Sequence, residues 1–438
     1  MIDEIHYLSG ELMIRTVVRM VAVLVTLASG TLHAQDTTFI RALRANVSPF
    51  TIVSGRMTGA GADALARVAR ENQFILVGED HGIRELPEFV SALFTAARPA
   101  GYRHLGVEIG PITGRRLETI MRAPDSQKEI DTFLGKYTPF TLPFFFWREE
   151  AQMLESIVKS VPGTRGVVWG LDQEFIMSPT YMFERLAAIA PSAAARTLAT
   201  QLGQASAKSD QTMIRTGNPG AVWMVTSSDA DVAKLQSTFA AKKGSEAEEI
   251  IRELSVSRDI YRMFNSGTNY ESNQKREDLM KHHFIDAYNT AKARGEAMPK
   301  AIIKLGANHV FRGPSTTDSY EIGSFIPEFV ETTGGKSFGI LVVVAKGTWN
   351  AYRPFGSDES DKTQKYDPLT TSEYAVFDIK SLLDAASPTE WTFIDLRPIR
   401  AGVANARIKG LNPKARRLLT SFDAVVVVPE GHASVYFR

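Results

Sequence analysis

FILVGEDHGIRE, residues 74–85, begins like a core strand and ends in charged groups. Its first four residues are apolar, as in a strand that is buried on both faces of a sheet. Glu79, Asp80 and His81 then place two carboxylates and an imidazole in consecutive positions. In open α/β sheets, ligands bind at the carboxyl ends of the strands. The stretch therefore predicts a buried strand whose end carries chemistry.

Similar apolar runs recur along the chain and alternate with amphipathic patterns. The predicted strands are HLGVEIG (104–110), GVVWGLD (166–172), AIIKLGA (301–307) and GILVVVA (339–345). Helical spacing is clearest in residues 61–73, 86–98 and 148–161. This order predicts an α/β fold with a mostly parallel central sheet covered by helices.

The remaining segments suggest one domain with additions. We expect a core over residues 40–346, with a large helical insertion at 179–294 over the strand carboxyl ends, because strand signals vanish there. Residues 347–371 are poor in apolar side chains and predict a surface loop. Residues 372–438 contain two further strand candidates, WTFIDL (391–396) and FDAVVVVPE (422–430), which would complete the same domain with helices.

The N-terminus is typical of a secretory signal. Arg15 and Arg19 precede an apolar run at 20–30, and the small residue Ala34 stands before Gln35. We therefore expect residues 1–34 to be a signal peptide cleaved after Ala34, with residues 1–12 an over-extended start upstream of Met13. The mature protein would be periplasmic or secreted, without a stable membrane anchor.

Composition excludes several classes of function. The chain has 438 residues, 44% of them hydrophobic, and a net charge of +1. With no long basic block, binding to nucleic acid is not expected. The chain contains no cysteine, which excludes disulfides and a thiol nucleophile. The expected partner is a small-molecule or peptide substrate, and the oligomeric state stays open.

Polar residues follow four of the predicted strands at their carboxyl ends. They are Glu79, His81, Glu108, Asp172, Asn308 and His309. Because the carboxyl ends of parallel strands share one edge, we expect these side chains to meet in one crevice.

Two histidines and three carboxylates suit hydrolysis by activated water. His81 and His309 would be general bases or metal ligands, and Glu79, Glu108 and Asp172 would orient an imidazole or raise its pKa. A divalent ion such as Mn, Co, Fe or Zn is an alternative, held by His81, His309, Glu108 and Asp172. No Gly-x-Ser-x-Gly elbow follows a predicted strand, so a serine hydrolase finds no support.

Each of these residues also has a structural interpretation. A carboxylate after a strand is more often a helix cap or a loop contact than a catalyst. His104, His282 and His283 are interpreted as structural or surface residues. His81 and His309 differ because each closes a Gly-x-x-His motif just after a buried strand.

These motifs resemble a known group of families. Gly78 to His81 and Gly306 to His309 look like the paired Gly-x-x-His motifs of the TIKI, TraB and ChaN proteins. Other segments are more similar to the erythromycin esterases, in this order: HGIRE (81–85), VEIG (107–110), FFFWREE (144–150), GLD (170–172), REDLM (276–280), FIDLR (393–397) and FDAVVVV (422–428). Erythromycin esterases have one more residue between the glutamate and the histidine, which leaves Glu79 and Glu85 as alternatives for the family carboxylate.

The resemblance implies a hydrolase that cleaves an ester, a lactone or an amide. Arg84, Glu85, Arg276 and Asn308 would then bind substrate, an arginine stabilising an oxyanion or a carboxylate. The ChaN resemblance implies an alternative, a haem- or metal-binding protein of iron uptake. Its axial ligand would come from a histidine or from one of four tyrosines in the helical region: Tyr181, Tyr261, Tyr270 and Tyr288. A third alternative is a scaffold or interaction protein that keeps the fold without the chemistry.

Export can be tested directly. Expression in a secretion-competent host should give a protein whose intact mass lacks everything through Ala34, because the charge, apolar length and small residue match a cleavable signal. A cytosolic product that keeps its N-terminus would contradict the prediction.

Overall fold

The computed structural model describes residues 38–350 and 362–437. The predicted signal peptide (1–34) lies outside the described residues, as do residues 351–361 of the predicted surface loop. In the described part, no helix combines the length and the apolar character needed to cross a bilayer.

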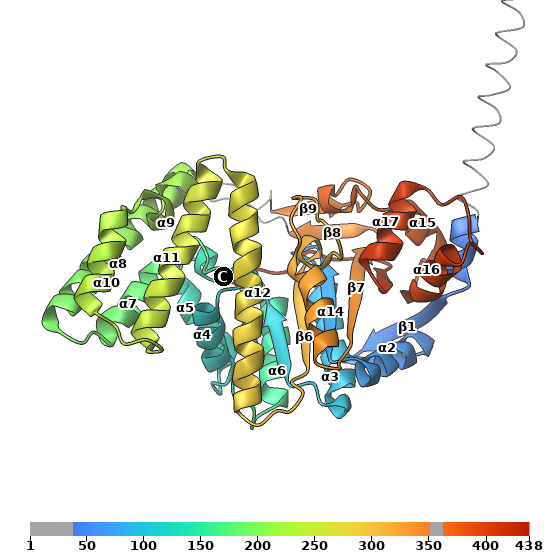
Figure 1. Cartoon of the computed structure of the whole chain (residues 1–438), viewed down its shortest axis with the longest axis horizontal. Helices are drawn as coiled ribbons and strands as arrows, with labels where there is room; N and C mark the ends of the chain where they lie inside the picture. Colours follow the sequence, from blue (N-terminus) through green and yellow to red (C-terminus); the bar gives the residue numbers. More distant parts are fainter. Residues whose placement is uncertain (1–37, 351–361, 438) are drawn as a thin grey trace, which may run out of the picture.

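The centre of the protein is a nine-stranded sheet with the order β2-β1-β10-β11-β7-β3-β6-β4-β5 (Figure 1). The strands are β1 (Val47–Val53), β2 (Arg56–Thr58), β3 (Phe74–Glu79), β4 (His104–Val107), β5 (Val168–Gly170), β6 (Ala301–Gly306), β7 (Ser337–Val344), β10 (Trp391–Asp395) and β11 (Ala424–Val428). Neighbours from β11 to β5 run parallel. Only the β2-β1-β10-β11 side is antiparallel. The α/β fold with a mostly parallel sheet is therefore confirmed.

β3 lies in the middle of the parallel part because both of its faces are apolar. Ile75 and Val77 pack into one hydrophobic cluster, and Phe74 and Leu76 pack into the other. Alternate side chains point to opposite faces of a strand, so β3 contributes to both layers of the core. Its register with β6 pairs Glu79 with Gly306. That pairing puts the two Gly-x-x-His motifs side by side.

Helices cover both faces of the sheet. One cluster includes residues of α2 (Ala60–Glu71), α3 (Glu85–Ala97), α4 (Pro111–Met121) and α6 (Arg148–Ser160). The other includes residues of α12 (Asn269–Ala293), α14 (Ile322–Thr332), α15 (Ile379–Ala385), α16 (Arg397–Ala404) and α17 (Pro413–Ser421). The three helices predicted from periodicity form as α2, α3 and α6. A one-turn helix, α13 (Ala307–Val310), follows β6.

The predicted insertion at 179–294 contains helices and no strand, as expected. It contains α7 (Pro179–Ala188), α8 (Ala193–Thr216), α9 (Trp223–Thr226), α10 (Asp229–Phe239), α11 (Glu246–Asn265) and α12. Figure 1 shows α7 to α11 gathered beside the sheet, with α12 between them and the strands. α12 is thus the helix of the insertion that lies next to the strands.

The prediction of a surface loop at 347–371 is wrong for the part that the structure describes. It contains β8 (Gly347–Asn350) and β9 (Thr363–Tyr366), which pair antiparallel. The backbone N–H of Asn350 donates to the carbonyl of Gly82 at 2.8 Å, and that of Thr348 donates to Gly431 at 2.9 Å. Contacts with distant backbone, rather than local apolar pattern, hold this hairpin in place.

The sequence also missed β1 and β2. They form an antiparallel ribbon at the sheet edge, where most side chains are partly or fully exposed. A half-exposed edge strand lacks the continuous apolar run that marks a buried one.

Candidate active site

A cavity of about 560 Å³ opens at the carboxyl ends of β3, β4 and β6. Two groups of residues line it. The strand ends contribute Glu79, Asp80, His81, Glu108, Gly306, Ala307, Asn308 and His309. The hairpin and the chain after it contribute Trp349, Gln364, Lys365, Tyr366, Asp367, Thr370, Thr371, Ser372 and Glu373. Five of the six polar residues predicted to converge thus line one cavity, and Asp172 does not. The sequence did not predict the wall that the hairpin forms.

Glu108 lies between the two histidines. Its Oε2 is 3.6 Å from Nε2 of His81, and its Oε1 is 3.4 Å from Nε2 of His309. The backbone N–H of Gly306 also donates to Oε2 at 2.7 Å. Burial would raise the pKa of Glu108, but His309 and His81 hold it well below its ordinary value. An ionised carboxylate therefore couples the two imidazoles.

Gly306 leaves room for this cluster. A Cβ at this position would lie 3.1 Å from Nε2 of His81 and 3.3 Å from Oε2 of Glu108. A side chain here would crowd both groups, so the glycine of the second Gly-x-x-His motif serves the close approach of β6 to the site.

His81 is held on two sides. Its Nδ1 lies 3.3 Å from Oε1 of Glu79, and its ring stacks on Phe144 with centroids 4.0 Å apart. Burial alone would lower the pKa of His81, but the neighbouring carboxylates Glu108 and Glu79 raise it to about 9. His81 is therefore a stronger base than an exposed histidine.

A buried ion network lies beneath His81. Lys304 of β6 donates to Glu79, and also to Oε1 of Glu150 at 2.8 Å. All three side chains are at most 5% exposed. Burial would lower the pKa of Lys304, but Glu150 and Glu79 hold it above its ordinary value. The ammonium thus holds the carboxylate of Glu79 in place against the histidine.

Arg276 of α12 binds the carboxylates from the side of the insertion. Its Nε donates to Oδ1 of Asp172 at 2.8 Å, and its terminal nitrogen donates to Oδ2 of Asp172 at 2.5 Å and to Oε1 of Glu108 at 3.0 Å. The predicted residues Asp172 and Arg276 thus pair with each other, and neither lines the cavity. Their effect on the site passes through Glu108.

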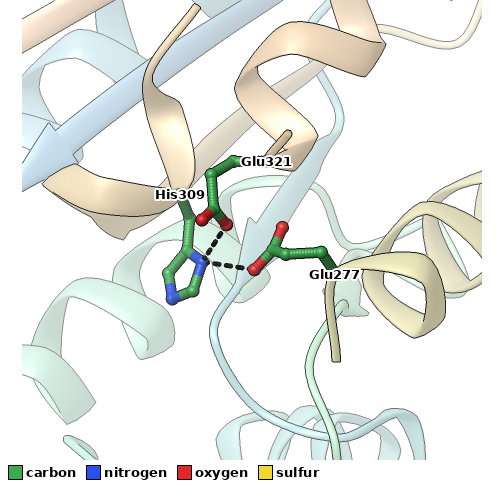
Figure 2. Close-up of side chains that lie close together, drawn as sticks. All are labelled: Glu277, His309 and Glu321. Atoms are coloured by element: carbon green, nitrogen blue, oxygen red, sulfur yellow. Dashed lines mark hydrogen bonds and ion pairs between the residues drawn. The ribbon is translucent and has the colours of Figure 1, made fainter. Parts of the chain in front are cut away.

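His309 makes a second carboxylate contact (Figure 2). Its Nδ1 donates to Oε1 of Glu277 at 2.7 Å and to Oε2 of Glu321 at 3.1 Å. Burial would lower the pKa of His309, but Glu108 and Glu277 raise it well above its ordinary value. Sequence reasoning missed both glutamates as site residues. Glu277 was visible as part of REDLM, whereas Glu321 is the residue just before α14 and carries no local signal.

Asp80, which the sequence left without a role, faces the hairpin. The hydroxyl of Tyr366 in β9 donates to Oδ2 of Asp80. Burial raises the pKa of Asp80 to about 6, against the opposing effect of this hydrogen bond. The hairpin is therefore attached to the first Gly-x-x-His motif itself.

Other predicted residues have different positions. Asn308 lines the cavity and accepts from Thr316 at 2.7 Å. Arg84 and Glu85 do not line it, and Glu85 instead accepts from the backbone and the ring of His432 at 2.8 and 2.7 Å. Of the two glutamates that the sequence left as alternatives, Glu79 is thus the one beside His81.

The four tyrosines proposed as axial ligands also lie elsewhere. Tyr181 and Tyr288 are buried in the hydrophobic clusters, and Tyr270 is 55% exposed. Tyr261 packs against the first cluster with its hydroxyl buried. In the described part of the chain, none of the four lines the cavity.

Solved structures share this fold, although no family model matches the chain and no curated protein does. A mutant of the erythromycin esterase EreC in its open conformation matches with a TM-score of 0.58 and 15% identity, over 86% of this chain and 95% of that one. A succinoglycan biosynthesis protein matches with a TM-score of 0.58 and 13% identity, over 92% and 99%. A Bacillus cereus protein matches at 0.53 and 16%, over 91% and 98%. At these identities the matches show the fold, which is that of an erythromycin esterase.

The ion network predicts a stability effect. Lys304→Met should lower the free energy of unfolding by about 3 to 5 kcal/mol, because it leaves two buried carboxylates without their cation. Lys234→Met, at an exposed position of α10, should change it by less than about 0.5 kcal/mol. Denaturant unfolding of both variants measures the difference, and equal midpoints would contradict the role of the network.

Proposed function

We propose that this chain is a hydrolase that activates water at the cavity for attack on an ester, a lactone or an amide. The observation that carries the proposal is the placement of Glu108 between His81 and His309, at the edge of the cavity. A base supported by carboxylates, beside a second imidazole, is the arrangement that general acid–base hydrolysis needs. The shared fold with an erythromycin esterase is consistent with it.

His81 would be the general base. It takes a proton from water as the oxygen adds to the substrate carbonyl, and it returns a proton to the leaving oxygen or nitrogen when the tetrahedral intermediate breaks. Glu79 and Glu108 stabilise the imidazolium formed in the first step, because both lie within 3.6 Å of a ring nitrogen.

His309 would stabilise the negative charge that develops on the carbonyl oxygen. Its pKa is well above the ordinary value, so at neutral pH it is a cation at the cavity wall. Arg276 is engaged by Asp172 and Glu108, so it would position Glu108 rather than bind the oxyanion.

The cavity wall suits a polar substrate. Lys365, Asp367 and Glu373 bring charges of both signs, and Trp349 offers an apolar ring. With the predicted signal peptide, this would be a small molecule or peptide met outside the cytoplasm.

Substitution of the two histidines tests the shared site. His81→Ala and His309→Ala should each lower kcat/KM by about a hundredfold to ten-thousandfold, because each loses a group that acts in the transition state. The double variant should lose much less than the product of the two effects, since the groups act as one unit. Hydrolysis of a panel of p-nitrophenyl esters, lactones and aryl amides measures this.

A matched control is His282→Ala, an exposed histidine of α12 that should keep full activity. If the unsubstituted protein hydrolyses nothing on the panel above the rate of His81→Ala, the hydrolase proposal fails. Fully multiplicative losses in the double variant would contradict a common site.

The pH dependence follows from the raised pKa of His81. A general base must be deprotonated, so kcat/KM should rise with pH, reach half of its plateau near pH 9 and level off above that pH. Glu108→Gln removes a carboxylate that raises this pKa, so the rising limb should move to lower pH. A rate that instead falls through pH 9 would assign His81 the role of an acid.

A further inference from the structure

Glu277, His309 and Glu321 form a three-donor cluster on the far side of His309 from Glu108 (Figure 2). One ligand atom from each residue lies within 4.8 Å of the other two. Glu277 lies in α12 and His309 in α13, and Glu321 is the residue that precedes α14. Three separate elements therefore converge on one point, and all three side chains are nearly enclosed, at 12% exposure or less.

The carboxylates are oriented by neutral donors. Ser315 and Thr317 donate their hydroxyls to Oε1 of Glu321 at 2.5 and 3.1 Å. The backbone N–H of Ile322 donates to Oε2 of Glu277 at 3.1 Å. In each glutamate the outer oxygen is thus satisfied, and the inner oxygen is directed at Nδ1 of His309. Outer donors of this kind hold the carboxylates that bind metal ions.

The other ring nitrogen of His309 has the partner that a metal-bound histidine usually has. Nε2 lies 3.4 Å from Oε1 of Glu108. In metal sites, the nitrogen that does not bind the ion commonly donates to a carboxylate, which fixes the tautomer and orients the ring. Glu108 would leave Nδ1 as the ligand atom, on the side of the two glutamates.

The spacing of the donors fits a first-row ion. Nδ1 is 2.7 Å from Glu277 and 3.1 Å from Glu321. Two ligands at right angles, each about 2.1 Å from an ion, are about 3.0 Å apart. Charge fits as well, because a divalent cation would replace the proton on Nδ1 of His309 and balance the two buried carboxylates.

We propose that Glu277, His309 and Glu321 bind one divalent first-row transition ion, such as Mn²⁺ or Zn²⁺, with further coordination positions left to water. The carboxylate-rich donor set with one imidazole suits these ions. The site differs from the ligand set expected from sequence, which also contained Asp172 and Glu108. In the structure Asp172 accepts from Arg276, and Glu108 accepts from the backbone N–H of Gly306. The metal site does not depend on the hydrolase proposal, because binding is measured without a substrate.

Metal titration of the intact protein tests the site. After treatment with a chelator and its removal, the protein should bind one equivalent of Mn²⁺, measured by loss of the free-ion signal in electron paramagnetic resonance. Zn²⁺ should compete with Mn²⁺ and raise the melting temperature with increasing concentration. No saturable equivalent of either ion in folded protein would overturn the proposal.

Three variants locate the ion. Glu321→Gln should abolish stoichiometric binding, and Ser315→Ala should weaken it by about tenfold to a hundredfold, because Ser315 only orients the ligand. Glu253→Gln is the matched control. Glu253 is a buried carboxylate of α11, and it lies 3.1 Å from Nε2 of His283 in α12, the helix that carries Glu277. The ring of His283 contacts no second carboxylate in the described part of the chain. The Glu253→Gln variant should bind like the unsubstituted protein.

The Ser315→Ala variant keeps the test decisive if Glu321→Gln does not fold, since it removes one hydroxyl and no charge. Unchanged affinity in folded Glu321→Gln or in Ser315→Ala would place any bound ion elsewhere and overturn the assignment. Weakened binding in Glu253→Gln equal to that in Ser315→Ala would do the same.

Discussion

The hydrogen bond from the backbone N–H of Gly306 to Glu108 ties the site together. It joins the ends of β4 and β6, and the β3–β6 register puts Glu79 directly opposite Gly306. Glu108 then faces cations on three sides: His81, His309 and Arg276. A carboxylate with 8% exposure stays ionised only when such partners repay its desolvation. The position of the two imidazoles therefore depends on a charge that the backbone of β6 fixes in place.

The same reasoning extends into the core. Lys304 occupies a central strand, where an apolar residue of similar size would pack at lower electrostatic cost. Its contacts with Glu79 and Glu150 place a cation one layer below the cavity. One oxygen of Glu79 and one of Glu150 are buried with no hydrogen-bond partner in the structure. This buried charge network is costly, and it lies where it stabilises the carboxylate beside His81. Such networks are more typical of functional sites than of cores selected for stability alone.

Sequence predicted the parts of the fold that have a local signal. Apolar runs marked β3, β4, β6, β7 and β11, and the polar residues after β3, β4 and β6 marked the edge where His81, Glu108 and His309 meet. The ion network of Lys304 was not predicted, because a single lysine in AIIKLGA carries no signal of its partners Glu79 and Glu150. Glu321 and the β8–β9 hairpin were missed because long-range contacts place them. Arg84 and Glu85 lie near His81 in sequence, but α3 begins at Glu85 and directs that carboxylate to His432.

The hairpin contacts the residues on both sides of His81. Gly82 has a φ of 82°, and a Cβ there would lie 2.1 Å from the carbonyl oxygen of Asn350, so only glycine lets β8 approach the residue after His81. The hydroxyl of Tyr366 in β9 donates to Asp80, the residue before His81. His81, the proposed base, is therefore flanked on both sides by contacts to the cavity wall. Any movement of this wall would act on the backbone of His81, so the strand ends and the hairpin form one mechanical unit.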